Sequence, residues 1–314
     1  KIFTNYKKDT FLLFLYFSNY SYFFFPIKIH SHIDLMRVVS IFGGSGFIGT
    51  ELIHELEKKD FEIRLFTRKK IPHTLNTLSK TRLIQLRDDT KLSKELIGSD
   101  IIIDLVGILH EQKGIRFDDV HSGRLKKLSK IAQKLNIKRF IHIGALGASV
   151  NAPSKYLQSK GKGEKHIKKQ CSNLAWTIYK PSIVFGVDDK FVNLFHNIIS
   201  FTPIIGLISP HSMFQPIWVK DLVDIIINGI DDKKTFQKTF NVAGPTSYSF
   251  MGLIKLISHH RNKKIIIVPL GKRLSYIIVT LMELLPIKII TRDNLKSMSI
   301  DSTVKVNDAY KFKS

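Results

Sequence analysis

The chain has 314 residues, of which 44% are hydrophobic and 24% charged, a balance that excludes intrinsic disorder and collagen-like architecture. A chain of this length buries about three quarters of its unfolded surface, so it needs no disulfide or structural metal for stability. Cys171 is the single cysteine and the sequence has no Cys/His cluster, so we expect no metal site and a reducing compartment.

The net charge is +23, from 49 Lys and Arg against 26 Asp and Glu. Lysine accounts for 38 of these cations and arginine for 11, and they are scattered along the chain. Dedicated nucleic-acid binding is typically marked by arginine-rich helices or zinc modules, and the sequence contains neither. We therefore expect no nucleic-acid partner.

Residues 1–35 differ in composition from the rest of the chain. An uncharged run of 18 residues, 10–27, follows Lys7 and Lys8, and its length is at the lower limit for a membrane span. The first methionine is Met36, directly before a strand pattern. We favour a leader outside the fold, either an organelle-type presequence or translated upstream sequence, with a signal anchor as the alternative.

From Met36 onward, strand and helix patterns alternate. Arg37–Phe42 is a β-branched run, and hydrophobic residues then recur at helical spacing through Leu56. Further strand patterns cover Phe61–Leu65, Leu83–Leu86, Ile101–Val106, Arg139–Ile143 and Ala175–Tyr179, with a helical pattern over Leu125–Leu135. Repeated βα units predict an α/β fold with a Rossmann-type doubly wound parallel sheet over residues 36–186. A smaller α+β region is predicted over residues 187–314, where prolines interrupt the pattern.

A glycine-rich turn separates the first strand from the first helix. Gly43, Gly46 and Gly49 have the spacing G-x-x-G-x-x-G. Glycines at these positions let backbone N–H groups and the helix N-terminus approach a pyrophosphate without obstruction by Cβ atoms. The turn, between a strand and a helix, therefore predicts dinucleotide binding.

The end of the second strand bears on which dinucleotide is bound. A carboxylate there would accept hydrogen bonds from the ribose 2′-OH of NAD, but this chain has Thr67-Arg68-Lys69-Lys70. A cationic tip suits the 2′-phosphate of NADP. We predict NADP, with NAD as the alternative, and Arg68 as the contact.

A second chemical motif is Tyr156-x-x-x-Lys160. Residues four apart share one face of a helix, so the ammonium group of Lys160 can stabilise a phenolate at Tyr156. Such a tyrosine can act as an acid or base in carbonyl reduction.

These residues resemble the extended branch of the short-chain dehydrogenase/reductase superfamily. More closely, the chain is similar to atypical members related to the nucleotide-binding accessory subunit of respiratory complex I, and to bacterial homologues called nucleoside-diphosphate-sugar epimerases. The resemblance begins at Met36 and rests on Ile41–Gly49 (IFGGSGFIG), Asp104–Leu109 (DLVGIL), Arg139–Ala148 (RFIHIGALGA), Ser154–Lys165 (SKYLQSKGKGEK), Lys180–Asn193 (KPSIVFGVDDKFVN), Phe214–Leu222 (FQPIWVKDL), Phe240–Pro245 (FNVAGP) and Thr291–Val304 (TRDNLKSMSIDSTV).

The resemblance implies roles for individual residues. Tyr156 and Lys160 match the catalytic pair, and Lys160 also contacts the cofactor. The loop from Pro181 to Val184 matches the one that borders the nicotinamide. The implied cofactor-binding residues are Gly43, Ser45, Gly46, Phe47, Ile48, Gly49, Arg68, Val106, Gly107, Lys160, Pro181 and Ile183.

The chain also departs from the family pattern. The superfamily normally has a Ser or Thr at the end of the fifth strand to hold the substrate carbonyl, and here the matching stretch is Gly144-Ala145-Leu146. His121 stands where a helix asparagine usually supports proton transfer. Ser149 or Ser154 is a candidate substitute for the missing hydroxyl.

Other conspicuous residues have simpler interpretations. We expect His142, Trp176 and Trp218 to be packing residues. The apolar residues of the stretch 274–285 recur at helical spacing after Lys272 and Arg273, over a length too short to span a bilayer. Core packing is the default, and docking on a membrane-arm subunit or on a membrane surface is the alternative hypothesis.

Three functions are compatible with the sequence. The protein is a soluble NADP-dependent oxidoreductase or sugar-nucleotide epimerase, a binding protein whose NADP stabilises a complex, or a nucleotide-sensing regulator. We favour the second, in a structural or assembly role with membrane-associated subunits of respiratory complex I, because the hydroxyl is missing at Gly144–Leu146. The predicted location is the bacterial cytoplasm or the inner face of the inner membrane, or the matrix side of a mitochondrion.

Overall fold

The computed structural model describes residues 36–68, 78–86, 90–112, 114–284 and 290–312. The chain divides into two compact units, residues 1–36 and 37–314. The predicted leader, residues 1–35, lies outside the described residues. The account below concerns the second unit.

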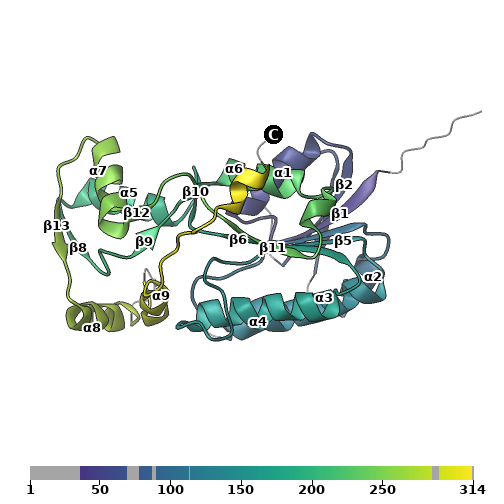
Figure 1. Cartoon of the computed structure of the whole chain (residues 1–314), viewed down its shortest axis with the longest axis horizontal. Helices are drawn as coiled ribbons and strands as arrows, with labels where there is room; N and C mark the ends of the chain where they lie inside the picture. The colour runs from purple at the N-terminus through teal and green to yellow at the C-terminus, as the bar shows by residue number, and fades with distance from the viewer. Residues whose placement is uncertain (1–35, 69–77, 87–89, 113, 285–289, 313–314) are drawn as a thin grey trace, which may run out of the picture. The chain divides into compact units, whose positions relative to one another are not determined.

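A seven-stranded sheet forms the centre of this unit (Figure 1). Its order is β11-β6-β5-β4-β1-β2-β3, and every pairing is parallel. The strands are β1 (Arg37–Phe42), β2 (Phe61–Thr67), β3 (Thr81–Gln85), β4 (Ile101–Asp104), β5 (Arg139–Ile143), β6 (Ala175–Pro181) and β11 (Lys238–Val242). The order reverses between β1 and β4, so the connections that follow these two paired strands lead to helices on opposite faces, the arrangement that leaves a crevice at the carboxyl ends of such a sheet. The predicted fold class is confirmed.

Helices cover both faces of the sheet (Figure 1). One face carries α1 (Phe47–Glu57), α6 (Val219–Asn228) and the 3₁₀ turn η4 (Asp308–Phe312), and the other carries α2 (Leu92–Glu95), α3 (Arg124–Lys134) and α4 (Lys155–Gln170). Strand residues alternate between the two resulting cores: Ile41 packs with α1 and α6, whereas Phe42 packs with α3. Burial on both faces explains why the central strands β1 and β4 are largely apolar.

Residues after 187 contribute to two structures. First, α6 and β11 complete the central sheet. Second, a smaller core contains Phe214, Phe250 and Leu253. The elements around this smaller core are α5 (Phe191–Phe201), β8 (Ile204–Leu207), β9 (Met213–Phe214), β12 (Tyr248–Ser249), α7 (Phe250–His260) and β13 (Ile266–Pro269). The division at residue 186 stays a prediction. Of the elements after that residue, β11 is a strand of the central sheet and α6 packs against the sheet.

Short elements link these two parts of the unit. Strand β7 (Val184–Phe185) pairs with β10 (Ile217–Trp218) in parallel, and β10 leads directly into α6. After β13 follow α8 (Lys272–Met282) and α9 (Arg292–Ser297). The π-helical segment η2 (Asp118–Gly123) precedes α3.

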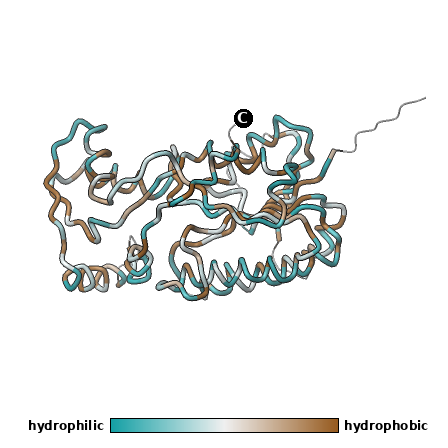
Figure 2. The backbone as a smooth tube through the Cα atoms, viewed as in Figure 1, coloured by the Kyte–Doolittle hydropathy of each residue, from teal (hydrophilic) through white to brown (hydrophobic). Residues whose placement is uncertain are grey.

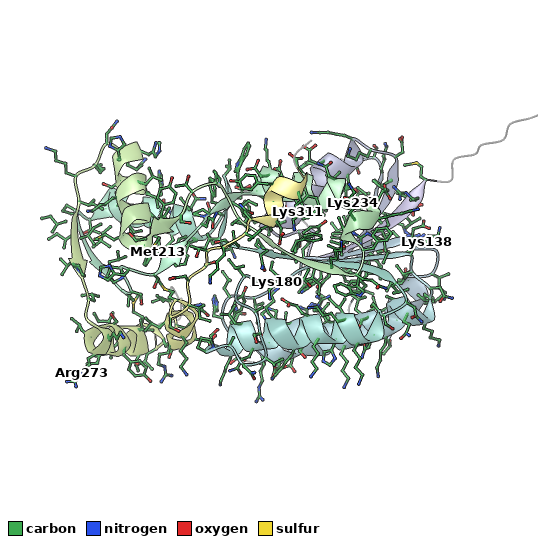
Figure 3. The ribbon with its side chains drawn as sticks, viewed as in Figure 1. Lys138, Lys180, Met213, Lys234, Arg273 and Lys311 are labelled. Carbon is green, nitrogen blue, oxygen red and sulfur yellow. The ribbon has the colours of Figure 1, made fainter. Side chains whose placement is uncertain are left out.

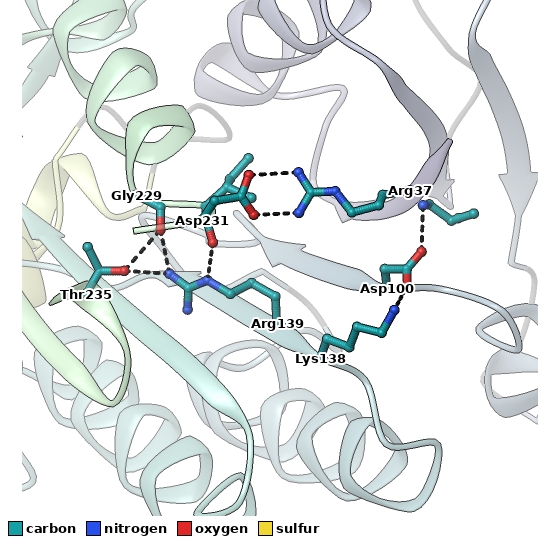
Figure 4. Close-up of polar contacts among 9 residues, drawn as sticks. Arg37, Asp100, Lys138, Arg139, Gly229, Asp231 and Thr235 are labelled. Atoms are coloured by element: carbon teal, nitrogen blue, oxygen red, sulfur yellow. Dashed lines mark hydrogen bonds and ion pairs between the residues drawn. The ribbon is translucent and has the colours of Figure 1, made fainter. Parts of the chain in front are cut away.

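The amino edge of the sheet is held by a buried arginine (Figure 4). Arg139, at the start of β5, is 4% exposed and donates to the carbonyl oxygens of Gly229 and Ile230, both at 2.8 Å. It also donates to Thr235 Oγ1 at 2.9 Å. At the same edge, Arg37 forms an ion pair with Asp231. These contacts join β5 to the loop after α6, at the opposite edge from the carboxyl-end crevice.

Among the residues that the structure describes, no helix has both the length and the apolar composition needed to cross a membrane.

Candidate dinucleotide-binding site

The glycine turn connects β1 to α1 at the carboxyl edge of the sheet. Gly43 has φ +80°, a left-handed conformation that favours glycine, and a Cβ there would lie 3.0 Å from Leu105 C and from Val106 N. The backbone N–H of Gly46 donates to the Gly43 carbonyl oxygen at 3.0 Å, which closes the turn. Helix α1 then begins at Phe47. The turn therefore lies against the segment that follows β4, at the carboxyl ends of β1 and β4.

Close packing explains another glycine pair in this turn. A Cβ at Gly49 would lie 2.4 Å from Gly44 Cα, so the first turn of α1 rests directly on the turn backbone. A Cβ at Gly44 would lie 2.4 Å from Leu65 Cδ1, on β2. The glycine spacing predicted a role for Gly49 in the dinucleotide-binding turn, but it predicted none for Gly44. The doubled glycine at residues 43 and 44 was the signal that could have revealed it.

The N-terminus of α1 suits an anionic group. Its first N–H groups lack carbonyl partners within the helix, and its first turn has no acidic residue. Gly46 is exposed at this end, with Ser45, Phe47 and Ile48 half-buried beside it. Together with the absent Cβ atoms, these features fit the pyrophosphate of a dinucleotide.

The segment after β4 connects the glycine turn to the Tyr-Lys motif. Val106 is half-buried and Gly107 is exposed. A Cβ at Gly107 would lie 3.4 Å from Lys160 Nζ and 3.7 Å from His121 Nε2. The structure therefore brings together four predicted positions: the glycine turn, Val106, Gly107 and Lys160.

Lys160 is buried under the crevice. Its side chain is on α4, it is 4% exposed, and its Nζ donates to the carbonyl oxygen of Ile143 at 3.0 Å. Burial lowers the pKa of Lys160 to about 8, although the negative charge of Asp104 acts in the opposite direction. The ammonium group is therefore easier to deprotonate than an exposed lysine.

Tyr156 lies one helical turn before Lys160, among aromatic rings. Its ring makes edge contacts with Phe117 and His121, at centroid distances of 5.7 and 5.5 Å. Burial raises the pKa of Tyr156 to about 12. Within the described part of the chain, no hydrogen bond joins the Tyr156 hydroxyl to Lys160 or to another group. This environment favours a neutral phenol.

His121 is a neutral, structurally held imidazole. Its Nε2 accepts from the backbone N–H of Ile108 at 3.0 Å, so its Nδ1 carries the proton and donates to Ser159 Oγ at 2.9 Å. Ser159 in turn donates to the carbonyl oxygen of Tyr156 at 2.7 Å. Burial, together with the charge of Lys160, lowers the pKa of His121 to about 2. His121 thus connects the segment after β4 to the Tyr156 helix.

Glu164 lies beside Gly144. Gly144 belongs to the stretch in which the family normally has a Ser or Thr. A Cβ at Gly144 would lie 2.7 Å from Glu164 Oε1. Glu164 is 5% exposed and pairs with Lys180 at 3.3 Å. Burial raises the pKa of the Glu164 carboxyl, against the effect of Lys180. A side chain at position 144 would therefore displace this carboxyl group.

The two serines considered as substitutes for the missing hydroxyl have other partners. Ser154 is fully buried, and its Oγ caps α4 by accepting from Leu157 N at 3.2 Å and from Ser297 Oγ at 2.8 Å. Ser149 is exposed, and its Oγ accepts from Asn151 N at 3.3 Å. In this arrangement, Ser154 serves the helix rather than a substrate.

A carboxylate from the C-terminal region also holds the start of α4. Asp293, on α9, accepts hydrogen bonds from Lys155 N at 2.7 Å and Tyr156 N at 3.0 Å. Asn294 donates to the carbonyl oxygen of Leu109 at 3.3 Å. Sequence reasoning missed Asp293, because its partners lie about 140 positions earlier in the chain.

The remaining predicted positions lie at the ends of β2 and β6. Arg68 directly follows β2 and is exposed, while Thr67 is 7% exposed; Lys69 and Lys70 lie outside the described residues. Pro181 is buried at the end of β6, and Ile183 is half-buried against the smaller core.

His142 has the packing role expected of it. It is 1% exposed, and its Nδ1 donates to Asp104 Oδ2 at 2.8 Å. Arg124 forms an ion pair with the other oxygen of Asp104. The described residues contain no cluster of His, Cys, Asp or Glu that could hold a metal ion.

The fold and the turn define a Rossmann-type NAD(P)-binding protein. Residues 43–190 match the family described as NAD(P)H-binding. The dTDP-glucose 4,6-dehydratase of Bacillus anthracis, solved in complex with NAD, has the same fold, with a TM-score of 0.64 and 16% identity over 75% of this chain and 85% of that one.

The particular relatives confirm the resemblance found in the sequence. The chain is similar to NADH dehydrogenase [ubiquinone] 1 alpha subcomplex subunit 9, mitochondrial. It is 28% identical to that of Mus musculus over 242 residues, or 74% of this chain and 63% of the relative. The Dictyostelium discoideum protein of the same name is 25% identical over 228 residues, with 70% and 63% covered. The chain thus spans just under two thirds of these relatives.

Proposed function

We propose that the protein binds NADP at the carboxyl edge of its sheet and uses it as a structural ligand in an assembly related to respiratory complex I. Membrane-associated subunits of that complex are the proposed partners. The proposed location is the matrix side of the mitochondrial inner membrane, or the corresponding inner face in a bacterium. The names of the relatives, which are mitochondrial subunits of an NADH dehydrogenase, support this proposal.

One observation favours a binding role over turnover: the surroundings of the Tyr156 hydroxyl. Burial holds the pKa of Tyr156 at about 12, so the phenolate that proton transfer requires is disfavoured at neutral pH. The stretch that would supply an orienting hydroxyl begins at Gly144, which lies next to the Glu164 carboxyl. A dinucleotide can bind in such a site without a partner for a substrate oxygen.

The end of β2 supports NADP over NAD. Arg68 follows the strand directly, and β2 ends in Thr67 rather than an acidic residue. A guanidinium group binds a phosphate through two parallel hydrogen bonds, whereas the ribose 2′-OH of NAD calls for an acceptor. We therefore assign Arg68 to the 2′-phosphate.

The alternative is an active NADP-dependent oxidoreductase or epimerase. Tyr156 and Lys160 lie on one helix at the spacing that such enzymes use, and a bound nicotinamide would supply or accept a hydride. Lys160, with its lowered pKa of about 8, would then stabilise the phenolate only in its protonated form.

Nucleotide-dependent stabilisation tests the binding proposal. We expect NADPH to raise the melting temperature of the full chain, because a ligand at a hundred times its Kd adds about 2.7 kcal/mol of stability. NADH should be less effective, and Arg68→Ala should remove the difference between the two nucleotides. Lys58→Ala, at an exposed position of an ion pair on α1, is the matched control and should leave it intact. Failure of both nucleotides to stabilise the protein would refute dinucleotide binding.

Tyr156→Phe separates the structural role from the catalytic one. We expect the variant to retain NADPH binding and to co-purify with the same complex subunits as the wild-type protein. If the variant assembles normally while a reductase or epimerase activity of the wild-type protein disappears, the structural proposal is wrong and the alternative is correct.

A further inference from the structure

Helices α3 and α4 expose a surface made almost entirely of lysine. Leu125 and Leu128 are fully buried on one side of α3, and lysines occupy the opposite side. Helix α4 has the same organisation, with Leu157 and Ile167 on its buried side. The surface, here called the lysine face, consists of Lys126, Lys127, Lys130, Lys134, Lys155, Lys162, Lys165 and Lys169.

Within α3 and α4 themselves, acidic residues are too few to balance these charges. The only acid within α3 and α4 is Glu164, which is buried on the other side of α4. Lys162 pairs with Asp118 at 2.9 Å, at the margin of the face. Burial, and then the positive charges of Lys126, Lys130, Lys165 and Lys169, lower the pKa of His166, so these four lysines of the two packed helices lie near one another.

A cavity of about 590 Å³ adjoins one end of the lysine face. Its lining contains three cations, Lys155, Lys162 and Arg116, and two acids, Glu111 and Asp118. The cavity therefore has a small excess of positive charge, and it is the lysine face itself that favours an anionic partner.

Helix α8 exposes an apolar stripe. Ser275 and Val279 are 3% and 0% exposed on its packed side. The opposite side presents Leu274, Ile277 and Leu281 at 49%, 55% and 60% exposure, and Leu284 follows at 80%. These four residues are called the apolar stripe below; Leu285, the last of the predicted set, lies outside the described residues. An amphipathic surface helix normally turns this side inward.

The lysine face and the apolar stripe belong to one row of helices. Helix α9 contacts both α4 and α8, and α3 packs along α4. The four helices follow the lower edge of the view in Figure 1, and Figure 2 shows the outer side of the α3 and α4 pair in the hydrophilic colour. Arg273 projects outward from the start of α8 (Figure 3).

We propose that the lysine face and the apolar stripe form a docking surface for an anionic lipid bilayer. Lysines attract anionic headgroups without demanding a defined geometry, and an exposed Leu and Ile stripe with cations at its start can enter the interfacial region. A nucleic acid or an acidic protein would use the lysines but leave the stripe exposed. A second copy of the chain would bring two lysine faces together. The bilayer is the occupant that uses both features.

This proposal goes beyond dinucleotide binding and does not depend on it. The lysine face points away from the sheet, and none of its residues belongs to the glycine turn. Failure of vesicle binding would leave the nucleotide experiment unaffected, and the reverse also holds.

Vesicle binding by the full chain tests the proposal. We expect sedimentation with vesicles of phosphatidylcholine and phosphatidylglycerol, weaker binding to phosphatidylcholine alone, and a decrease with salt. The triple variant Lys126→Glu/Lys130→Glu/Lys165→Glu should bind at least about 100-fold more weakly, since each basic residue near the surface contributes about fivefold.

The matched control carries the same change of net charge elsewhere. Lys233→Glu/Lys234→Glu/Lys238→Glu alters three exposed lysines of η3 (Lys233–Thr235) and β11, outside the row of helices; Figure 3 labels Lys234. This variant should bind like the wild-type protein. Equal weakening of both triple variants would show a response to net charge alone and would overturn the assignment of the surface. A circular dichroism spectrum and a melting temperature like those of the wild-type protein report that each variant is folded.

The contribution of α8 is tested at high salt, where attraction between charges is screened. The double variant Ile277→Asn/Leu281→Asn should lose the residual binding that the wild-type protein keeps. Val187→Asn/Val306→Asn, at positions 90% and 71% exposed outside the stripe, should keep it. Binding that is equal for neutral and anionic vesicles, or a preference for an anionic polynucleotide over vesicles, would overturn the proposal.

Discussion

At the scale of single residues, burial of the Lys160 ammonium group destabilises the folded protein, and the same group lies next to the predicted cofactor site. Its pKa of about 8, against 10.5 in water, corresponds to an unfavourable burial of the ammonium group on the order of 3 kcal/mol. The carbonyl oxygen of Ile143 is the one hydrogen-bond partner of this group within the described residues. A positive charge is thus held under the predicted nicotinamide site at the expense of the folded state.

Lys160→Met should therefore raise the melting temperature of the nucleotide-free protein at pH 7 and weaken NADPH binding. Because the unfolded state binds more protons than the folded state between pH 8 and 10.5, the wild-type protein gains stability as the pH rises through this window. The advantage of the variant should shrink over the same range. Thermal unfolding from pH 7 to 10 measures it, and an advantage that does not depend on pH would contradict the assigned cause.

Residues whose role follows from local backbone geometry were predictable from the sequence. The spacing of Gly43, Gly46 and Gly49 predicts a turn, and the structure places these glycines between the end of β1 and the first turn of α1. Glu164 and Gly44 were missed because their roles come from contacts with residues distant in the sequence. The preference for NADP at Arg68 stays a prediction.

At the scale of elements, the start of α4 depends on α9. Asp293 accepts two backbone N–H groups that would otherwise lack partners, one of them from Tyr156. The Thr291 capping box fixes α9 itself. Part of the C-terminal region thus positions the helix that carries the Tyr-Lys pair.

Asp293→Ala should lower the free energy of unfolding by about 1–2 kcal/mol, as expected for the loss of a helix cap. Asp60→Ala, at a fully exposed position whose nearest lysine lies at 3.8 Å, is the control and should change it by less than about 0.5 kcal/mol. Urea denaturation followed by circular dichroism measures both. Equal effects of the two substitutions would exclude a capping role for Asp293.

Elements with a strong pattern were predicted closely. The strand predicted over Arg139–Ile143 is β5, and the helix predicted over Leu125–Leu135 is α3 with its ends shifted by one residue. The strand predicted over Ile101–Val106 ends at Asp104, because the chain turns there toward the crevice. The partners of the short strands after residue 187 could not be predicted, since two-residue strands leave no periodic signal.

At the scale of the whole molecule, Arg139 ties three parts of the chain together at the amino edge of the sheet. Its guanidinium bonds reach β6 and the loop between α6 and β11, and its position over the Phe236 ring adds a cation–π contact at 4.7 Å. Burial lowers the pKa of Arg139 to about 10, so it stays charged at neutral pH.

Arg139→Met should destabilise the protein by about 3 kcal/mol or more, because several buried carbonyl and hydroxyl groups lose their donor at once. Lys138→Ala, one residue earlier and 78% exposed, should have little effect. Chemical unfolding of the two variants measures the difference. A small effect for Arg139→Met would mean that water replaces the guanidinium group at this edge.

The sequence predicted the sheet, its parallel direction and the position of the turn, because βα repeats constrain the topology strongly. The seventh strand could not be predicted: β11 follows β6 only after α5, the short strands β7 to β10 and α6 have intervened. The apolar residues of α8 were visible in the sequence, but their exposure is a property of the folded molecule.

The distance in sequence between β6 and β11 has a consequence for folding during translation. While the ribosome is still translating the elements from α5 to α6, β6 is an open edge, and unpaired edges favour pairing with other chains. The edge closes once β11 pairs with it, and the packing of Phe312 against Tyr179 follows only after η4 emerges. Nascent chains that stall before this point should be the ones that recruit chaperones or aggregate, which ribosome profiling of chaperone-bound chains can reveal.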